Sequence, residues 1–113
     1  MKTVKFTSEL TELIKKGEKS ATFRLFDDKN LTTGDEAILA TRDGEAVTNF
    51  AKAKLVHVYT KAIKNLNKDD YRGHEPINEN PLEDYRKYYG NRVTEDTEVK
   101  IVRFEVVKWI DEN

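Results

Sequence analysis

The clearest signal for the fold of this 113-residue chain lies in residues 17–26, which read Gly17-Glu18-Lys19-Ser20-Ala21-Thr22-Phe23-Arg24-Leu25-Phe26. Apolar and polar residues alternate over residues 21–26, which predicts a strand with Thr22 and Arg24 side by side on one face. Gly17 ends a preceding helix, and the short turn after it delivers Lys19 to the start of the strand. An amine, a hydroxyl and a guanidinium can therefore converge there, although an edge strand with polar decoration is the alternative.

Two amphipathic helices flank this strand in the sequence. The first is predicted over residues 8–16, because its apolar residues recur at helical spacing and Gly17 stands where a left-handed cap belongs. The second is predicted between Asn80, a good N-cap, and Gly90, with Pro81 at the first helical position.

The remaining strands are predicted from turn signals and apolar runs. They are an apolar stretch over residues 37–40 after the turn Thr33-Gly34-Asp35, a hairpin at Arg42-Asp43-Gly44-Glu45, a long strand over 50–60 with a bulge near Leu55, and a closing strand over 99–110. This order predicts an α+β fold, in which a curved sheet closes into a small β-barrel with helices covering its ends. The length predicts a single domain over residues 1–113.

The composition excludes several classes of site. The chain has no Cys, two His and a net charge of −1, so disulfides, thiol nucleophiles and iron–sulfur clusters are excluded. We expect no metal and no cofactor. No apolar run approaches the roughly 20 residues of a membrane span, and the chain start lacks an apolar signal stretch. We therefore expect a cytoplasmic monomer without membrane contact.

The pattern Gly-x-Lys-x-x-Thr-x-Arg after a short amphipathic helix, followed by Thr33-Gly34-Asp35, resembles the ASCH family, the activating signal cointegrator homology domains with a PUA-like barrel. The order of motifs agrees over nearly the whole chain. The resemblance implies a cleft between the sheet and the helices that binds RNA or a nucleoside or nucleobase derivative. A module that binds a protein partner is another alternative.

Some small bacterial members of that family are amidohydrolases that act on N4-acetylcytidine with a Lys, a Thr and a Glu. The resemblance places their Lys on Lys19 and their Thr on Thr22, and the strand arginine on Arg24. Arg72 stands where their Glu would be, so Glu75, or Glu79 as a second candidate, would have to replace it.

The chemistry of these residue types fits an acyl transfer. A threonine hydroxyl becomes a nucleophile only when a neighbouring base takes its proton, and Lys19 can be that base only if burial or a nearby cation lowers its pKa. Arg24 could supply that cation or stabilise a developing oxyanion. Glu75 would protonate the leaving amine.

Further residues are candidates for substrate binding. Lys52 and Lys54 are expected to form a basic strip near the cleft together with Lys61 and Lys64, which would contact phosphate, although solvated lysines are the commoner case. His74 follows a glycine in an irregular segment and could reach the cleft.

Aromatic residues could offer a stacking surface for bases. Tyr71 or Tyr88 is the candidate for stacking, because Tyr85 and Tyr89 fit the buried stripe of the second helix. His57 is expected to be a hydrogen-bonded core residue, since it lies between apolar residues of the long strand.

Overall fold

A computed structural model describes residues 1–74 and 81–110 of the chain. The elements follow one another as β1 (Lys2–Phe6), α1 (Ser8–Lys15), β2 (Ala21–Leu25), β3 (Glu36–Asp43), β4 (Ala46–Ala62), the short 3-10 helices η1 (Ile63–Asn65) and η2 (Lys68–Tyr71), α2 (Pro81–Tyr89) and β5 (Glu98–Trp109). Both predicted helices and the strands around the hairpin are therefore confirmed. None of the described helices is long and apolar enough to cross a membrane.

The five strands form one sheet in the order β1-β3-β4-β5-β2, in which only β1 and β3 run parallel. The sheet curls strongly. Strands β1 and β5 are not neighbours in it, yet the ring centres of Phe6 and Phe104 lie only 6.0 Å apart. Arg24 of edge strand β2 donates through Nη2 to the carbonyl of Lys5 in the other edge strand, at 2.8 Å. The predicted α+β class and curved sheet are confirmed, in the form of a half-barrel whose two edges are bridged by a side chain.

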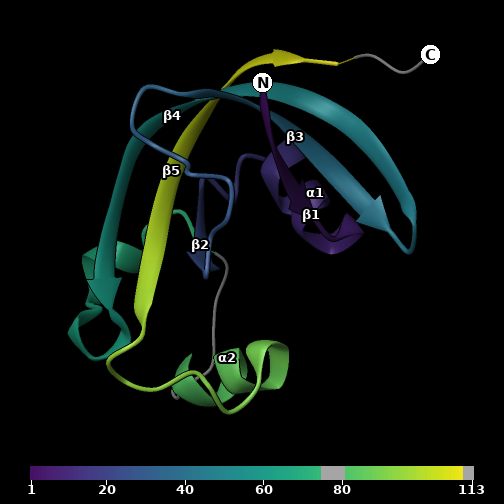
Figure 1. Cartoon of the computed structure of the whole chain (residues 1–113). Helices are drawn as coiled ribbons and strands as arrows, with labels where there is room; N and C mark the ends of the chain where they lie inside the picture. Colours follow the sequence, from purple (N-terminus) through teal and green to yellow (C-terminus); the bar gives the residue numbers. More distant parts are fainter. Residues whose placement is uncertain (75–80, 111–113) are drawn as a thin grey trace.

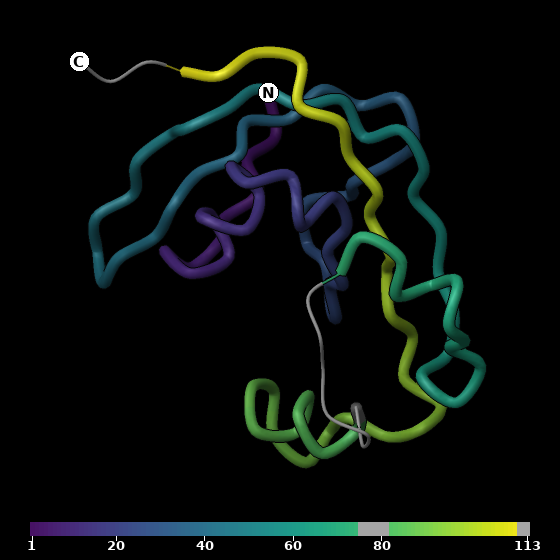
Figure 2. The backbone as a smooth tube through the Cα atoms, turned by 180° about the vertical axis from the view of Figure 1, so that it is seen from behind, coloured from purple at the N-terminus to yellow at the C-terminus, as the bar shows by residue number. Residues whose placement is uncertain are grey.

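The helices lie at different places around the sheet (Figure 1). Helix α1 packs under the arch of β3 and β4 and contacts β1 and β3. Helix α2 lies at the opposite, open end, and β2 lies between the two helices in both views (Figure 2). The sheet thus separates two layers of packing that meet at β2.

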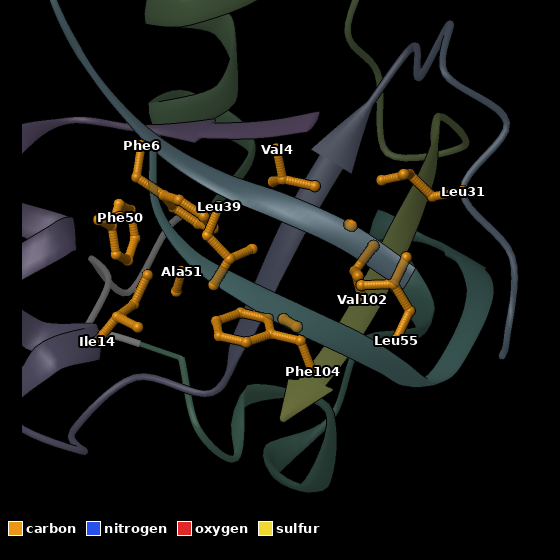
Figure 3. Packing of buried hydrophobic residues seen from close by; sticks show 12 residues of the cluster. Val4, Phe6, Ile14, Leu31, Leu39, Phe50, Ala51, Leu55, Val102 and Phe104 are labelled. Carbon is orange, nitrogen blue, oxygen red and sulfur yellow. The ribbon is translucent and has the colours of Figure 1, made fainter. Parts of the chain in front are cut away.

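The first layer, named here the inner core, fills the inside of the curl (Figure 3). It contains aliphatic side chains and three phenylalanines from β1, α1, β3, β4 and β5, among them Phe6, Leu39, Phe50, Leu55 and Phe104. Leu39 and Leu55 have no exposed surface. Burial of this kind is the main source of stability in a domain of this size.

The second layer, named here the outer core, lies on the other face of β5 and β2. Its buried members are Phe23, Leu25, Ile63, Val93, Val99 and Ile101. Half-buried side chains complete it, and four of these six are tyrosines, Tyr59, Tyr71, Tyr85 and Tyr89. Because a tyrosine keeps a polar tip, this layer needs hydrogen-bond partners that the inner core does not need.

Three local predictions fare differently. The bulge is confirmed by a register shift between Leu55 and His57 against β5. The same shift overturns the expectation for His57, which is exposed and lies with its ring 4.6 Å from that of Tyr59. Strand β1 was not predicted at all. Its residues Val4 and Phe6 alternate with polar ones, but two lysines in five residues weaken the apolar signal.

Candidate functional site

A cavity of about 310 Å³ lies beside edge strand β2, between α1 and α2. Residues from β1, α1, β2, the segment after η2, and α2 line it: Lys5, Phe6, Thr7, Leu10, Thr22, Phe23, Arg24, His74, Asp84, Tyr85, Tyr88 and Tyr89. Because β2 is the last strand of the sheet, residues from both sides of the sheet reach its edge. The cavity is therefore formed where the inner and outer cores meet.

Aromatic rings form much of the cavity wall. The rings of Phe23 and His74 lie 4.4 Å apart between centroids, and Tyr85 and Tyr89 approach from α2. Tyr88 lines the cavity as well, and with 82% of its surface exposed it lies at the rim. Flat apolar walls of this kind suit a planar ligand.

Polar groups lie among these rings. Thr22 is buried on the inner face of β2, opposite Val102, and Arg24 follows it on the same face. The guanidinium carbon of Arg24 lies 5.2 Å from the centre of the Phe6 ring. The guanidinium group of Arg24 therefore packs on a residue of β1. Asp84 adds a carboxylate from α2. The cavity thus combines a hydroxyl, a cation and an anion with aromatic walls.

Lys19 is 3% exposed, which is rare for a lysine, and its Nζ donates to the carbonyl of Ala21 at 2.7 Å. The turn that carries it begins with a Schellman motif, in which Gly17 (φ 79°) and Glu18 donate to the last carbonyls of α1. Of the three residues predicted to converge, Thr22 and Arg24 line the cavity. Lys19 lies at the start of the same strand but is not among the lining residues.

The segment that carries His74 is docked onto β2 by backbone hydrogen bonds. The carbonyl of Gly73 accepts from the amides of Ser20 and Ala21 at 2.7 and 3.0 Å. Gly73 has φ +80°, and a Cβ there would come within 2.4 Å of Ser20 Oγ. The positive φ favours glycine at position 73, and the next residue, His74, packs its ring on Phe23.

A buried carboxylate anchors the segment on its other side. Asp70 accepts hydrogen bonds from Tyr59 Oη (2.8 Å), Lys61 Nζ (2.9 Å) and the amide of Asn67 (2.8 Å). Burial acts to raise the pKa of Asp70, but these hydrogen bonds outweigh it and hold the pKa below its usual range. Asp70 is therefore charged in the folded protein and ties η2 to β4.

Arg103 of β5 completes this anchor. Its guanidinium donates to the carbonyls of Arg72 (2.5 Å) and Asp69 (2.6 Å) and to Tyr59 Oη (3.3 Å). Neither Asp70 nor Arg103 was predicted from the sequence as part of the site. A local signal existed for Asp70, because Asn67 and Asp70 have the spacing of a capping box; Arg103 showed none.

The lysines predicted to lie beside the cavity are placed elsewhere. Lys52 and Lys54 alternate with Ala51, Ala53 and Leu55, which are buried in the inner core, so they point to the outside of the sheet. Lys52 pairs with Glu36 at 3.0 Å. The basic strip beside the cleft is thus not formed, and Lys61 and Lys64 are likewise engaged, with Asp70 and Asp96.

Tyr71 is also placed outside the cavity. Its ring packs on Phe23 at 5.2 Å, and burial together with Asp70 raises the pKa of its hydroxyl. Glu75 and Glu79, the two candidates for the acid, lie outside the described residues. Within residues 1–74 and 81–110, no three His, Asp or Glu side chains gather as metal ligands.

Comparisons with known proteins identify the fold. No protein-family model matches the sequence, and no curated protein sequence matches it. A solved structure from Enterococcus faecalis V583, of the family DUF984, is 17% identical with a TM-score of 0.74, covering 100% of this chain and 84% of that one. The ASCH domain from Lactobacillus crispatus JV V101 is 16% identical with a TM-score of 0.67, covering 95% of this chain and 80% of that one.

ASCH from Zymomonas mobilis is 16% identical, with a TM-score of 0.66 over 96% of this chain and 68% of that one. At these identities the likeness concerns the fold. The chain therefore has the fold of these solved ASCH domains, as its motifs predicted.

Proposed function

We propose that the cavity beside β2 binds the base of a nucleoside or of a single-stranded RNA. The observation that carries the proposal is the combination of aromatic walls with Thr22, Arg24 and Asp84 in one cavity of about 310 Å³. This volume lies at the lower end of the roughly 300–1,000 Å³ of small-molecule sites, and base–aromatic stacking is a common mode of single-strand recognition.

The polar groups can complement the edge of a base. Arg24 can donate to a ring nitrogen or carbonyl oxygen, and the Asp84 carboxylate can accept from an exocyclic amine or ring N–H. Bases carry both donors and acceptors, so a cation and an anion in one cavity suit them better than they suit an apolar ligand. The likeness of the fold to ASCH domains is consistent with this proposal.

The test measures, by isothermal titration calorimetry, the affinity of the purified protein for the four common nucleosides and for N4-acetylcytidine. Tyr88→Ala should weaken binding by about 1–3 kcal/mol if its ring stacks on the base. Trp109→Ala is the matched control, since it removes another exposed ring that does not line the cavity. Absence of binding by every nucleoside, or equal effects of the two variants, would contradict the proposal.

A second candidate is an amidohydrolase in the same cavity, favoured by the burial of Lys19 at the start of the strand that carries Thr22. Lys19 would take the proton of the Thr22 hydroxyl, whose oxygen attacks the acyl carbonyl of an N-acylated nucleoside. Arg24 would stabilise the oxyanion, and Glu75 would protonate the leaving amine. Water would then hydrolyse the acyl-threonine ester, which releases the carboxylic acid and restores the hydroxyl.

Incubation with N4-acetylcytidine and mass analysis tests this candidate. Lys19→Met and Thr22→Val should each abolish release of acetate, and Glu75→Gln should reduce it by about 10²–10⁴-fold. Lys16→Met, which removes an exposed lysine at the end of α1, is the control for Lys19→Met. A wild type that binds nucleosides but releases no acetate would leave the binding function alone.

A further inference from the structure

We propose that a cationic hollow next to the cavity is a phosphate-binding subsite, so that the ligand is a phosphorylated nucleoside. The inference rests on the proposed binding of a base in the cavity and specifies the class of ligand. It is carried by the charges of four side chains, Lys5, Arg24, Lys29 and Arg42, on one continuous surface.

The hollow and the cavity adjoin each other. The hollow has a volume of about 490 Å³ and shares Lys5, Phe6, Thr7 and Arg24 with the cavity. A ligand whose base lies among the aromatic rings can therefore extend along β1 into the hollow. Arg24 lies at the junction, because its guanidinium reaches across to the Lys5 carbonyl.

The charge of the hollow is one-sided. Four of its seven lining residues are cationic and none is acidic, in a chain that holds 21 acidic and 20 basic residues. Among the described residues, neither Lys5, Lys29 nor Arg42 has a carboxylate within ion-pair distance. The neighbouring lysines of β4 and η1 differ, since Lys52, Lys61 and Lys64 each pair with an acid.

Lys29 and Arg42 are held in place by contacts that do not neutralise them. Lys29 Nζ donates to the carbonyl of Thr3 at 2.7 Å, and Arg42 Nε donates to that of Gly44 at 3.3 Å. These bonds use one donor each, whereas an ammonium has three donors and a guanidinium five. The side chains are thus oriented by the backbone and still carry positive charge into the hollow.

Phosphate is the ligand group that this chemistry favours. Arginine and lysine form short, charge-assisted hydrogen bonds to phosphate oxygens, and clustered cations attract anions from solution. A phosphate could be the end of a mononucleotide or part of an RNA strand. The cavity and the hollow share residues of β1, and a mononucleotide and an RNA strand would both present phosphate oxygens to the hollow.

The experiment compares the affinity of the wild type for each nucleoside, its 5′- and 3′-monophosphate and a short single-stranded RNA with the same base at one end. A phosphate should raise affinity roughly tenfold over the nucleoside, the order that one charge-assisted hydrogen bond supplies. In Lys29→Ala/Arg42→Ala the gain should fall below about threefold, while nucleoside affinity stays unchanged. A further gain for RNA, with a salt slope of about −0.7 per added phosphate, identifies a strand, and no further gain identifies a mononucleotide.

The matched control is Lys54→Ala/Lys108→Ala, which removes the same charge from exposed positions of β4 and β5 outside the hollow. Equal affinities for nucleoside and nucleotide, or equal losses in the two double variants, would overturn the phosphate subsite and leave the base-binding cavity intact. Inorganic tripolyphosphate provides a separate readout. If it binds with a loss in Lys29→Ala/Arg42→Ala while no nucleoside or nucleotide binds, the subsite stands and the cavity function fails; if nothing binds, both fail.

Discussion

The inner and outer cores meet at β4 and β5, which contribute side chains to both, yet the two cores differ in chemistry. The inner core is aliphatic and phenylalanine throughout, and all twelve of its principal members are buried. The outer core is completed by half-buried tyrosines, and one of them, Tyr59, donates to the carboxylate of Asp70 and accepts from Arg103. The inner core therefore supplies close-packed apolar burial, whereas the outer core has polar tips and lies next to the cavity.

Physical reasons support this difference between the two cores. Close-packed aliphatic side chains tolerate little change in volume, so a ligand site inside them would cost much stability. Tyrosines with hydrogen-bonded tips can present a face to a ligand while remaining attached to the fold. Edge strand β2 contributes Phe23 to the outer core and places Thr22 on the other face, opposite Val102 of the inner core, so the two residues reach the cavity from opposite faces.

The largest effect is expected from Leu39→Ala in the inner core. Leu39 is fully buried, so the lost transfer free energy and the cavity left behind should reduce the free energy of unfolding by about 2–5 kcal/mol. Ile38→Ala, the next residue on the opposite, half-buried face, should cost less than half as much. Urea unfolding measures both. Equal losses would remove the distinction between the two faces.

Asp70→Asn should reduce the free energy of unfolding by roughly 2–3 kcal/mol, because Lys61 and the other donors lose a charged acceptor. Ligand affinity should fall as well, since the segment that places Gly73 and His74 loosens. Asp69→Asn is the control, as its neighbouring carboxylate is exposed. A loss of stability without a loss of affinity would separate the anchor from the site.

The same variant gives a pH test with a defined sign. The pKa of Asp70 is lower in the folded than in the unfolded chain, so its stabilisation is present above the ordinary value of about 3.9 and is lost as pH falls through the folded pKa. Unfolding by urea between pH 7 and pH 2 should show a smaller acid-induced loss in Asp70→Asn than in the wild type. Parallel profiles would contradict the assigned charge.

Gly73→Ala should cost about 1–2 kcal/mol for its left-handed backbone and a smaller additional amount because Ser20 Oγ must move away from the added Cβ. Gly17→Ala has nearly the same φ with nothing within 4 Å of the added Cβ, so it measures the backbone cost alone. Ser20→Ala/Gly73→Ala should recover the difference. No difference between the two glycine variants in thermal unfolding would show that the docking of the segment on β2 is loose.

The smallest change in stability is expected at Asp35, which lies in the turn before β3 and belongs to neither core. Hydrogen bonds from Lys2 and Thr32 lower the pKa of its carboxyl to about 2. Its contribution is therefore present above the unfolded value and disappears as pH falls toward 2. Carboxyl NMR titration should give this midpoint in the wild type and a higher one in Lys2→Ala. An unchanged midpoint would remove Lys2 as the cause.

Local signals predicted most of the fold. The Schellman end of α1 at Gly17, the tight hairpin at Gly44 and the bulge after Leu55 all lie where short-range patterns placed them. Strand β1 was missed because a five-residue strand with two lysines becomes stable only when it pairs in parallel with β3, a partner some thirty-five residues away. Short-range sequence patterns cannot predict a pairing between residues so far apart in the chain.

The site divides in the same way. Sequence alternation by itself placed Thr22 and Arg24 on one face of a strand, because side-chain direction in a strand follows from backbone geometry alone. The placement of the other residues depends on the tertiary structure. Lys52 and Lys54 point away from the cavity, whereas Asp84 and Tyr85 line it. Lys5, Lys29 and Arg42 lie together in the hollow. These facts depend on how far the sheet curls and where its edges meet, which is fixed by packing between distant residues such as Phe6 and Phe104.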